Sequence, residues 1–145
     1  MIPSTVTFID EFCFEECISL ETIDIPNGIE QLPFLCFGKC SSLKEITIPT
    51  SVTKLEKLCF EKCTSLSRIN IPERIVEIGK KCFYKCISLK WIYIPATVTM
   101  IGENCFEKCP DIAIYKVTER KISLTSEYEN NNQDKMSIEY ETVKK

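Results

Sequence analysis

Residues 49–71 read PTSVTKLEKLCFEKCTSLSRINI, and this 23-residue pattern recurs along the chain without a change of spacing. Its most constant part is Cys-Phe-x-x-Cys, which occurs five times and contains all ten cysteines: Cys13 and Cys17, Cys36 and Cys40, Cys59 and Cys63, Cys82 and Cys86, Cys105 and Cys109. A fixed period of this size is typical of a solenoid of stacked units rather than of an enzyme with one cleft.

Each part of the unit has its own structural preference. The closing Ile-x-Ile alternates and is β-branched, which predicts a short strand with both isoleucines facing inward. The proline that follows has no backbone N–H, so we expect the chain to turn there. The next segment, Val/Ile-x-x-Ile/Leu, predicts a second short extended stretch. The two cysteines of each block are four residues apart, which fits one face of a single helical turn.

The whole pattern, Pro-x-x-Val/Ile-x-x-Ile/Leu-x-x-x-Cys-Phe-x-x-Cys-x-Ser-Leu-x-x-Ile-x-Ile, resembles the units of the BspA-like leucine-rich repeat family over residues 2–117. The resemblance implies a β-rich, right-handed leucine-rich-repeat solenoid of five 23-residue units with short strands and single helical turns. It also implies binding of other macromolecules, since some family members on the surfaces of bacteria and parasitic protists act as adhesins. Here cysteine replaces the alanine that the family commonly has before the phenylalanine.

The sequence predicts two regions, a solenoid over residues 1–118 and a C-terminal segment over residues 119–145. The last unit loses the pattern after Cys109, as terminal repeats that cap a core often do. The C-terminal segment is polar, and both a capping β-hairpin and a disordered tail are compatible with it. The first unit has no comparable cap, so its open edge favours a homo-oligomer through the N-terminal end.

Composition indicates an ordinary soluble protein, because no stretch approaches the roughly 20 apolar residues of a membrane span. The first residues lack a basic segment followed by an apolar core, so we expect no signal peptide and a cytoplasmic location with reduced thiols; the cell surface is the alternative. Residues 1–30 carry seven acidic and no basic side chains. This asymmetry favours head-to-tail association, although chance clustering on a solvated surface is the simpler explanation.

The cysteines allow three interpretations. Metal binding is disfavoured because the spacing is Cys-x3-Cys and the chain has no histidine. Disulfides between neighbouring units would need an oxidising compartment. The preferred interpretation is structural, with buried thiols acting as small hydrophobes beside a phenylalanine column formed by Phe14, Phe37, Phe60, Phe83 and Phe106. No cofactor is predicted.

The absence of histidine also removes Cys-His and Ser-His catalytic pairs, and the four glycines form no phosphate-binding loop. We therefore predict a non-catalytic protein–protein interaction module. The alternatives are an adhesin-like cell-surface protein and a thiol- or metal-binding protein that uses the cysteine columns.

The residues beside the inward isoleucines are predicted to form two outward columns on one sheet face. One column contains Thr22, Glu45, Arg68, Trp91 and Ile114, and the other contains Asp24, Thr47, Asn70, Tyr93 and Lys116. Trp, Tyr and Arg are enriched at binding hot spots. The predicted partner-binding residues are therefore Arg68, Asn70, Trp91, Tyr93, Ile114 and Lys116. The alternative is that the C-terminal segment folds back over the tryptophan.

A second row of charged side chains precedes the second cysteine of each block: Glu16, Lys39, Lys62, Lys85 and Lys108. Four lysines in register could contact phosphates. The net charge of −3 and the glutamates beside two of the lysines disfavour nucleic-acid binding, so a solvated lysine face is the better interpretation.

Overall fold

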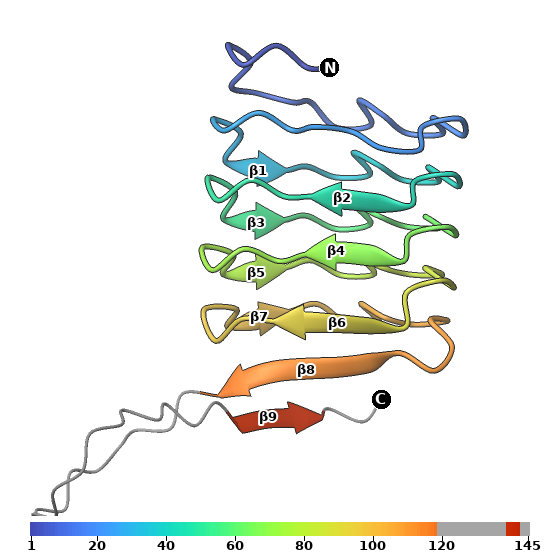
Figure 1. Ribbon diagram of the computed structural model, residues 1–145, viewed down its shortest axis with the longest axis vertical. Coiled ribbons are helices and arrows are strands. Elements are labelled where there is room, and N and C mark those ends of the chain that lie inside the picture. The colour runs from blue at the N-terminus through green and yellow to red at the C-terminus, as the bar shows by residue number, and fades with distance from the viewer. Residues whose placement is uncertain (119–138, 143–145) are drawn as a thin grey trace, which may run out of the picture.

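The computed structural model describes residues 1–118 and 139–142, which form a solenoid of units stacked along one axis (Figure 1). The N-terminus lies at one end of the stack, and strands β8 (Ala113–Thr118) and β9 (Glu139–Thr142) lie at the other. The predicted stack of 23-residue units is thus confirmed. The units stack because strands 23 residues apart pair in register, as Gln31 does with Lys54.

Two walls of short strands run along the stack. The back wall is a parallel sheet of β1 (Gln31–Leu32), β3 (Lys54–Leu55), β5 (Glu77–Ile78) and β7 (Met100–Ile101). The front wall contains β2 (Glu45–Thr47) paired in parallel with β4 (Arg68–Asn70), and β6 (Trp91–Ile94) paired in parallel with β8. Strand β9 pairs antiparallel with β8. The Ile-x-Ile segments therefore form the predicted strands in β2, β4 and β6.

The core lies between the two walls and is entirely apolar among the described residues. The front wall supplies isoleucines such as Ile69 and Ile92, and the back wall supplies residues such as Leu55 and Ile78. Phe37, Phe60 and Phe83 are fully buried and stack face to face, with ring centroids 5.5 Å apart. Parallel rings at this spacing let every unit fill the same space in the core as its neighbour.

The Cys-Phe-x-x-Cys segments run along a third side of the stack, here called the turn edge (residues 10–17, 33–40, 56–63, 79–86 and 102–109). The expected single helical turns are not formed in the described part of the chain. In the second unit the amides of Cys36 and Cys40 donate instead to the carbonyls of Pro33 and Phe37, three residues earlier. The third residues of these turns, Leu35 and Lys39, have φ of 52° and 61°, as type II turns require.

The hydrogen bonds of other turn edge amides explain why these segments form turns rather than a helix. The Leu35, Phe37 and Lys39 amides point out of their own unit and donate to carbonyls of the next unit at 3.3, 2.9 and 2.6 Å. A helix would use every amide within its own segment. Because every second amide donates to a carbonyl of the next unit, each turn edge segment is hydrogen-bonded to its neighbours as a strand in a sheet would be.

The last unit is one residue shorter than the others. Trp91 pairs with Ala113 and Ile92 with Ile114, an offset of 22 residues where the other strand pairs have 23. Ile114 is consequently buried, with 6% exposure, and the prediction that it belongs to an outward column is wrong. Lys116 pairs with the buried Ile94 rather than with Tyr93, so its predicted place beside Tyr93 is wrong for the same reason.

The prediction of a capping hairpin or a disordered tail over residues 119–145 falls mostly outside the described residues. Of this segment the structure describes β9, whose backbone pairs with that of β8 from Tyr115 to Thr118. The boundary of the solenoid at residue 118 stays a prediction.

The phenylalanine stack provides a direct stability test. Replacing the fully buried Phe60 by alanine should lower the free energy of unfolding by about 3–5 kcal/mol, because the cavity lies in the middle of the stack. Urea unfolding followed by circular dichroism measures the loss. Phe8→Ala is the matched control, since Phe8 is 67% exposed and should change stability by less than about 1 kcal/mol. Equal losses in both variants would contradict the assigned core.

Candidate interaction face and cysteine columns

The outer face of the front wall carries the predicted outward columns. The strands alternate, so Arg68 and Asn70 are exposed while Ile69 between them is buried. The same alternation in β6 exposes Trp91 by 51% and leaves Tyr93 partly exposed. Four predicted partner-binding residues, Arg68, Asn70, Trp91 and Tyr93, are thus brought together on one face.

These four residues border a shallow depression of about 320 Å³. Its lining includes Ile46, Ile69 and Ile71, whose side chains are buried in the core, and Trp91 and Tyr93 line the side nearest the end of the stack. Arg68 stands in register with Glu45 on the neighbouring strand. The depression is therefore charged on one flank, at Glu45 and Arg68, and aromatic on the other.

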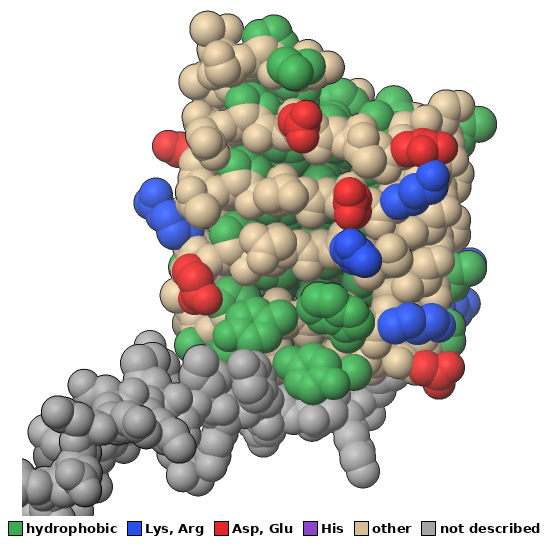
Figure 2. Space-filling model, in the orientation of Figure 1, with side chains coloured by type: hydrophobic (Ala, Val, Ile, Leu, Met, Phe, Trp, Pro, Cys, Tyr) green, Lys and Arg blue, Asp and Glu red, His purple; other side chains and the backbone are tan. Residues whose placement is uncertain are grey.

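An aromatic patch of Trp91, Tyr93 and Tyr115 occupies the end of this face near β8. Tyr115 pairs with Tyr93 across the two strands and is 38% exposed. Figure 2 shows large hydrophobic side chains gathered at this end, while the rest of the face is mainly polar. Exposed aromatic groups of this kind mark interaction sites because they combine a large apolar area with a polar tip.

Sequence reasoning missed Tyr115 because it assumed an unbroken period of 23. The signal was present in the spacing. The leucine and the first strand isoleucine are three residues apart at Leu89 and Ile92, but the corresponding Ile112 and Ile114 are only two apart. This single missing residue moves Tyr115 to the outside and Ile114 to the core.

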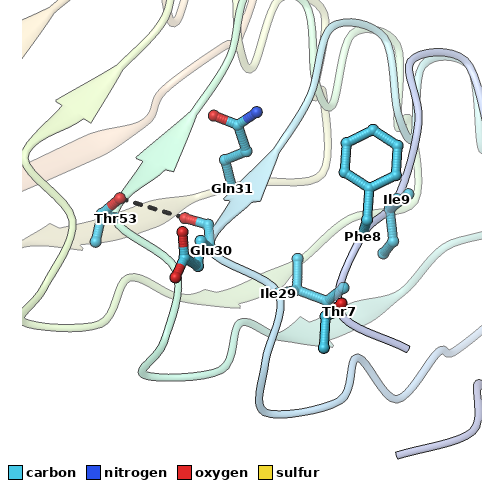
Figure 3. A pocket seen from close by; sticks show the side chains of 7 residues that line it. All are labelled: Thr7, Phe8, Ile9, Ile29, Glu30, Gln31 and Thr53. Carbon is cyan, nitrogen blue, oxygen red and sulfur yellow. Dashed lines mark hydrogen bonds between the residues drawn. The ribbon is translucent and has the colours of Figure 1, made fainter. Parts of the chain in front are cut away.

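The N-terminal end of the stack has exposed apolar side chains. Met1, Phe8, Phe12 and Ile18 are between 46% and 108% exposed. Of these, Phe8 lines a hollow of about 250 Å³, which is shown in Figure 3. Along one side of the hollow the Thr53 hydroxyl donates to the Glu30 carbonyl at 3.3 Å. Self-association through this end stays a prediction.

The cysteines form two columns inside the turn edge. All ten are free thiols, of which eight are buried, Cys17 is half-buried and Cys13 is exposed. From the second unit onward the second cysteine of each block donates its Sγ–H to the carbonyl of the phenylalanine in the preceding unit, as Cys63 does to Phe37 at 3.1 Å. The thiols are therefore small core groups that also tie units together.

Burial makes these thiols resistant to ionisation. Desolvation, with a smaller contribution from neighbouring Cys17, raises the pKa of Cys40 to about 11. Desolvation likewise raises the pKa of Cys105 to about 12 and places the pKa of Cys59 and Cys82 well above the usual value. Since the thiolate is the nucleophile and the metal ligand, these buried cysteines are poorly suited to both roles.

Among the residues that the structure describes, no group of three or more His, Cys, Asp or Glu side chains could hold a metal ion. The same described residues include no helix long and apolar enough to cross a membrane.

The repeats identify the relatives of the chain. Residues 1–113 match the family described as BspA type leucine rich repeat region, in six copies. This chain belongs to the BspA-type leucine-rich repeat family. The expected resemblance is thereby confirmed, and the cysteine that precedes each phenylalanine is a feature of this BspA-type chain. No curated protein matches it.

Solved structures of three leucine-rich proteins are similar to this chain in fold. A leucine-rich repeat protein from Bacteroides ovatus has 31% identity and a TM-score of 0.72, covering 78% of this chain and 32% of its own. The T. pallidum leucine rich repeat protein has 28% identity and a TM-score of 0.70, covering 72% and 49%. A leucine rich cell surface protein from Faecalibacterium prausnitzii has 27% identity and a TM-score of 0.62, covering 79% and 37%. The chain thus spans less than half the length of each.

Thiol labelling tests the cysteine columns. In the folded protein, Ellman's reagent should react quickly with Cys13, more slowly with Cys17, and with the remaining eight only after unfolding, because those eight are buried. A Cys13→Ser variant should lose the fast phase. Ten equally reactive thiols in the folded protein would contradict the assigned burial.

Alkaline pH should destabilise the fold. A thiol with a higher pKa in the folded than in the unfolded state loses its proton first in the unfolded chain, so the free energy of unfolding falls as pH rises. For Cys40 the loss begins near 9.0 and ends near its folded pKa of about 11, with a slope of up to about 1.4 kcal/mol per pH unit. Urea titrations between pH 8 and 10.5 should show the fall, and Cys40→Ala should reduce its slope. A free energy of unfolding independent of pH would disprove this account.

Proposed function

We propose that the chain is a non-catalytic protein-interaction module that binds a protein partner through the outer face of the front wall. The observation that carries the proposal is the exposed aromatic patch of Trp91, Tyr93 and Tyr115 beside the depression bordered by Arg68 and Asn70. Membership of a leucine-rich repeat family supports it, because stacked repeats offer extended surfaces for recognition.

The composition of the face supports one specific partner rather than a uniform polymer. Down the first column the side chains change from Glu45 to Arg68 to Trp91, so successive units present different chemistry. Tryptophan, tyrosine and arginine commonly supply most of the binding energy in such interfaces. The polar Thr47 and Asn70 would form the surrounding rim.

The absence of catalysis is part of the proposal. The chain has no histidine, and burial raises the pKa of most of its thiols. The front-wall depression is lined by one arginine, one glutamate and otherwise uncharged residues, a set that offers positioning and charge complementarity rather than a nucleophile with its base.

A surface-exposed module is the second candidate. It is favoured by the similarity to the Faecalibacterium prausnitzii protein, whose description calls it a cell surface protein. Labelling of intact cells with a membrane-impermeant biotin reagent decides between a surface and a cytoplasmic module. Ten free thiols in freshly isolated protein would favour the cytoplasm, since extracellular cysteines tend to oxidise.

Removal of the aromatic patch tests the binding face. A Trp91→Ala/Tyr115→Ala variant should lose the proteins that the wild type captures specifically from extract of its own cells. A loss of about 2 kcal/mol or more, roughly thirtyfold in affinity, is expected if either residue is a hot spot.

The matched control is Val76→Ala/Met100→Ala, which removes two apolar side chains that are 49% and 56% exposed elsewhere on the stack. This control should capture the same proteins as the wild type, and circular dichroism should show both variants folded. If the aromatic variant retains its partners, or if both variants lose them, the front face is not the binding surface.

A further inference from the structure

Three lysine ammonium groups converge on one tyrosine ring at the turn edge. The Nζ atoms of Lys81, Lys85 and Lys108 lie 5.0, 5.5 and 5.6 Å from the centroid of the Tyr84 ring. Lys81 and Lys85 belong to the same unit as Tyr84, and Lys108 belongs to the following unit. These four residues, here called the lysine–tyrosine cluster, lie on a different side of the stack from the aromatic patch.

The lysines of the cluster lack the carboxylate partners that Lys39 and Lys62 have in the turn edge. Lys39 pairs with Glu15 at 3.1 Å and with Glu16 at 2.6 Å, and Lys62 pairs with Glu61 at 3.4 Å. No ion pair within 4.0 Å between described side chains involves Lys81, Lys85 or Lys108. Three ammonium groups without an ion pair to a described carboxylate are therefore gathered around Tyr84.

The lysine that the following unit contributes keeps its positive charge beside the tyrosine. A hydrogen bond with the Tyr84 side chain, together with the weaker attraction of Glu107, raises the pKa of the Lys108 ammonium. Lys108 is thus charged at neutral pH. The Tyr84 ring attracts each of the three ammonium groups, since every Nζ lies within 5.6 Å of its centroid.

The backbone at the three lysines adopts a strained left-handed conformation. Lys81, Lys85 and Lys108 have φ of 54°, 59° and 60°, in the left-handed region that costs an L-residue roughly 1–2 kcal/mol. Glycine or asparagine would meet the requirement of the turn with less strain. This conformation belongs to the repeat rather than to the lysines, since Leu35 and Glu16 have φ of 52° and 58° at the equivalent positions.

We propose that the lysine–tyrosine cluster binds a single phosphate or sulfate group. Lysine ammoniums are point charges suited to phosphate, the ring supports the lysine stems, and the phenol hydroxyl can donate a hydrogen bond. A single group fits better than a nucleic-acid backbone, because Glu61 and Glu107 occupy the positions equivalent to Tyr84 in the two neighbouring units.

Chemical-shift titration of the ¹⁵N-labelled protein tests this site. The probes are inorganic phosphate, inorganic sulfate, glucose 6-phosphate and glucose 6-sulfate, each added at constant ionic strength near neutral pH. The amides of Tyr84 and Lys85 should shift in a saturable way. Saturation by the inorganic ions as tightly as by the sugar esters identifies a free ion as the ligand, and tighter saturation by the esters identifies an esterified group. No saturable shift with any of the four probes would overturn the proposal.

A charge-matched pair of variants separates the site from general attraction. Lys81→Gln/Lys85→Gln/Lys108→Gln should weaken binding about tenfold, since three exposed charge contacts together contribute about 1.4 kcal/mol. Lys39→Gln/Lys44→Gln/Lys80→Gln removes the same charge from lysines already paired with glutamates, and should leave the dissociation constant within about twofold. Equal weakening in both variants would show attraction to the whole molecule and overturn the assigned site.

Discussion

The alternate amides of the turn edge are the interaction on which the rest of the structure depends. Phe12, Phe14 and Glu16 donate to the second unit, and their counterparts repeat this across each later junction. This ladder fixes the distance and the register between units on the side where no sheet forms. The phenylalanine rings can stack at 5.5 Å, and the cysteine thiols can reach the preceding unit, only because the backbone beneath them is held in register.

The ladder also explains the amino-acid choices of the repeat. The first cysteine and the phenylalanine of each block pack against the same two residues in the preceding and following units. The side chain at the cysteine position must therefore be small, and the side chain at the phenylalanine position must be planar. Eight of the ten cysteines are buried there as thiols, and the second cysteine adds a hydrogen bond that alanine could not make. The cysteines therefore set packing and register, while variable chemistry lies on the outer faces.

Much of this arrangement could be predicted from the sequence, because a period of 23 with apolar residues at fixed positions has few ways to bury them. The strands at Ile46 and Ile69 and the phenylalanine column follow directly from that pattern. The turns could not be predicted, since nothing in a lysine such as Lys39 signals a positive φ. The exposed position of Tyr115 was not predicted, because the unit lacks one residue before Ile114. This deletion turns Ile114 toward the core and Tyr115 toward the outer face. The identity of a partner could not be predicted, because it depends on outward side chains that the packing of the core does not constrain.

The direction of the ladder has an electrical consequence. The peptide that links Phe34 and Leu35 accepts from the preceding unit through its carbonyl and donates to the following unit through its amide. Peptides so aligned add their dipoles, as those of a helix do, with the positive pole toward the later units. The acidic first unit lies at the negative pole and the Tyr84 lysines lie toward the positive one. The turn edge therefore carries a potential gradient along its length, which would orient a charged molecule before any contact is made.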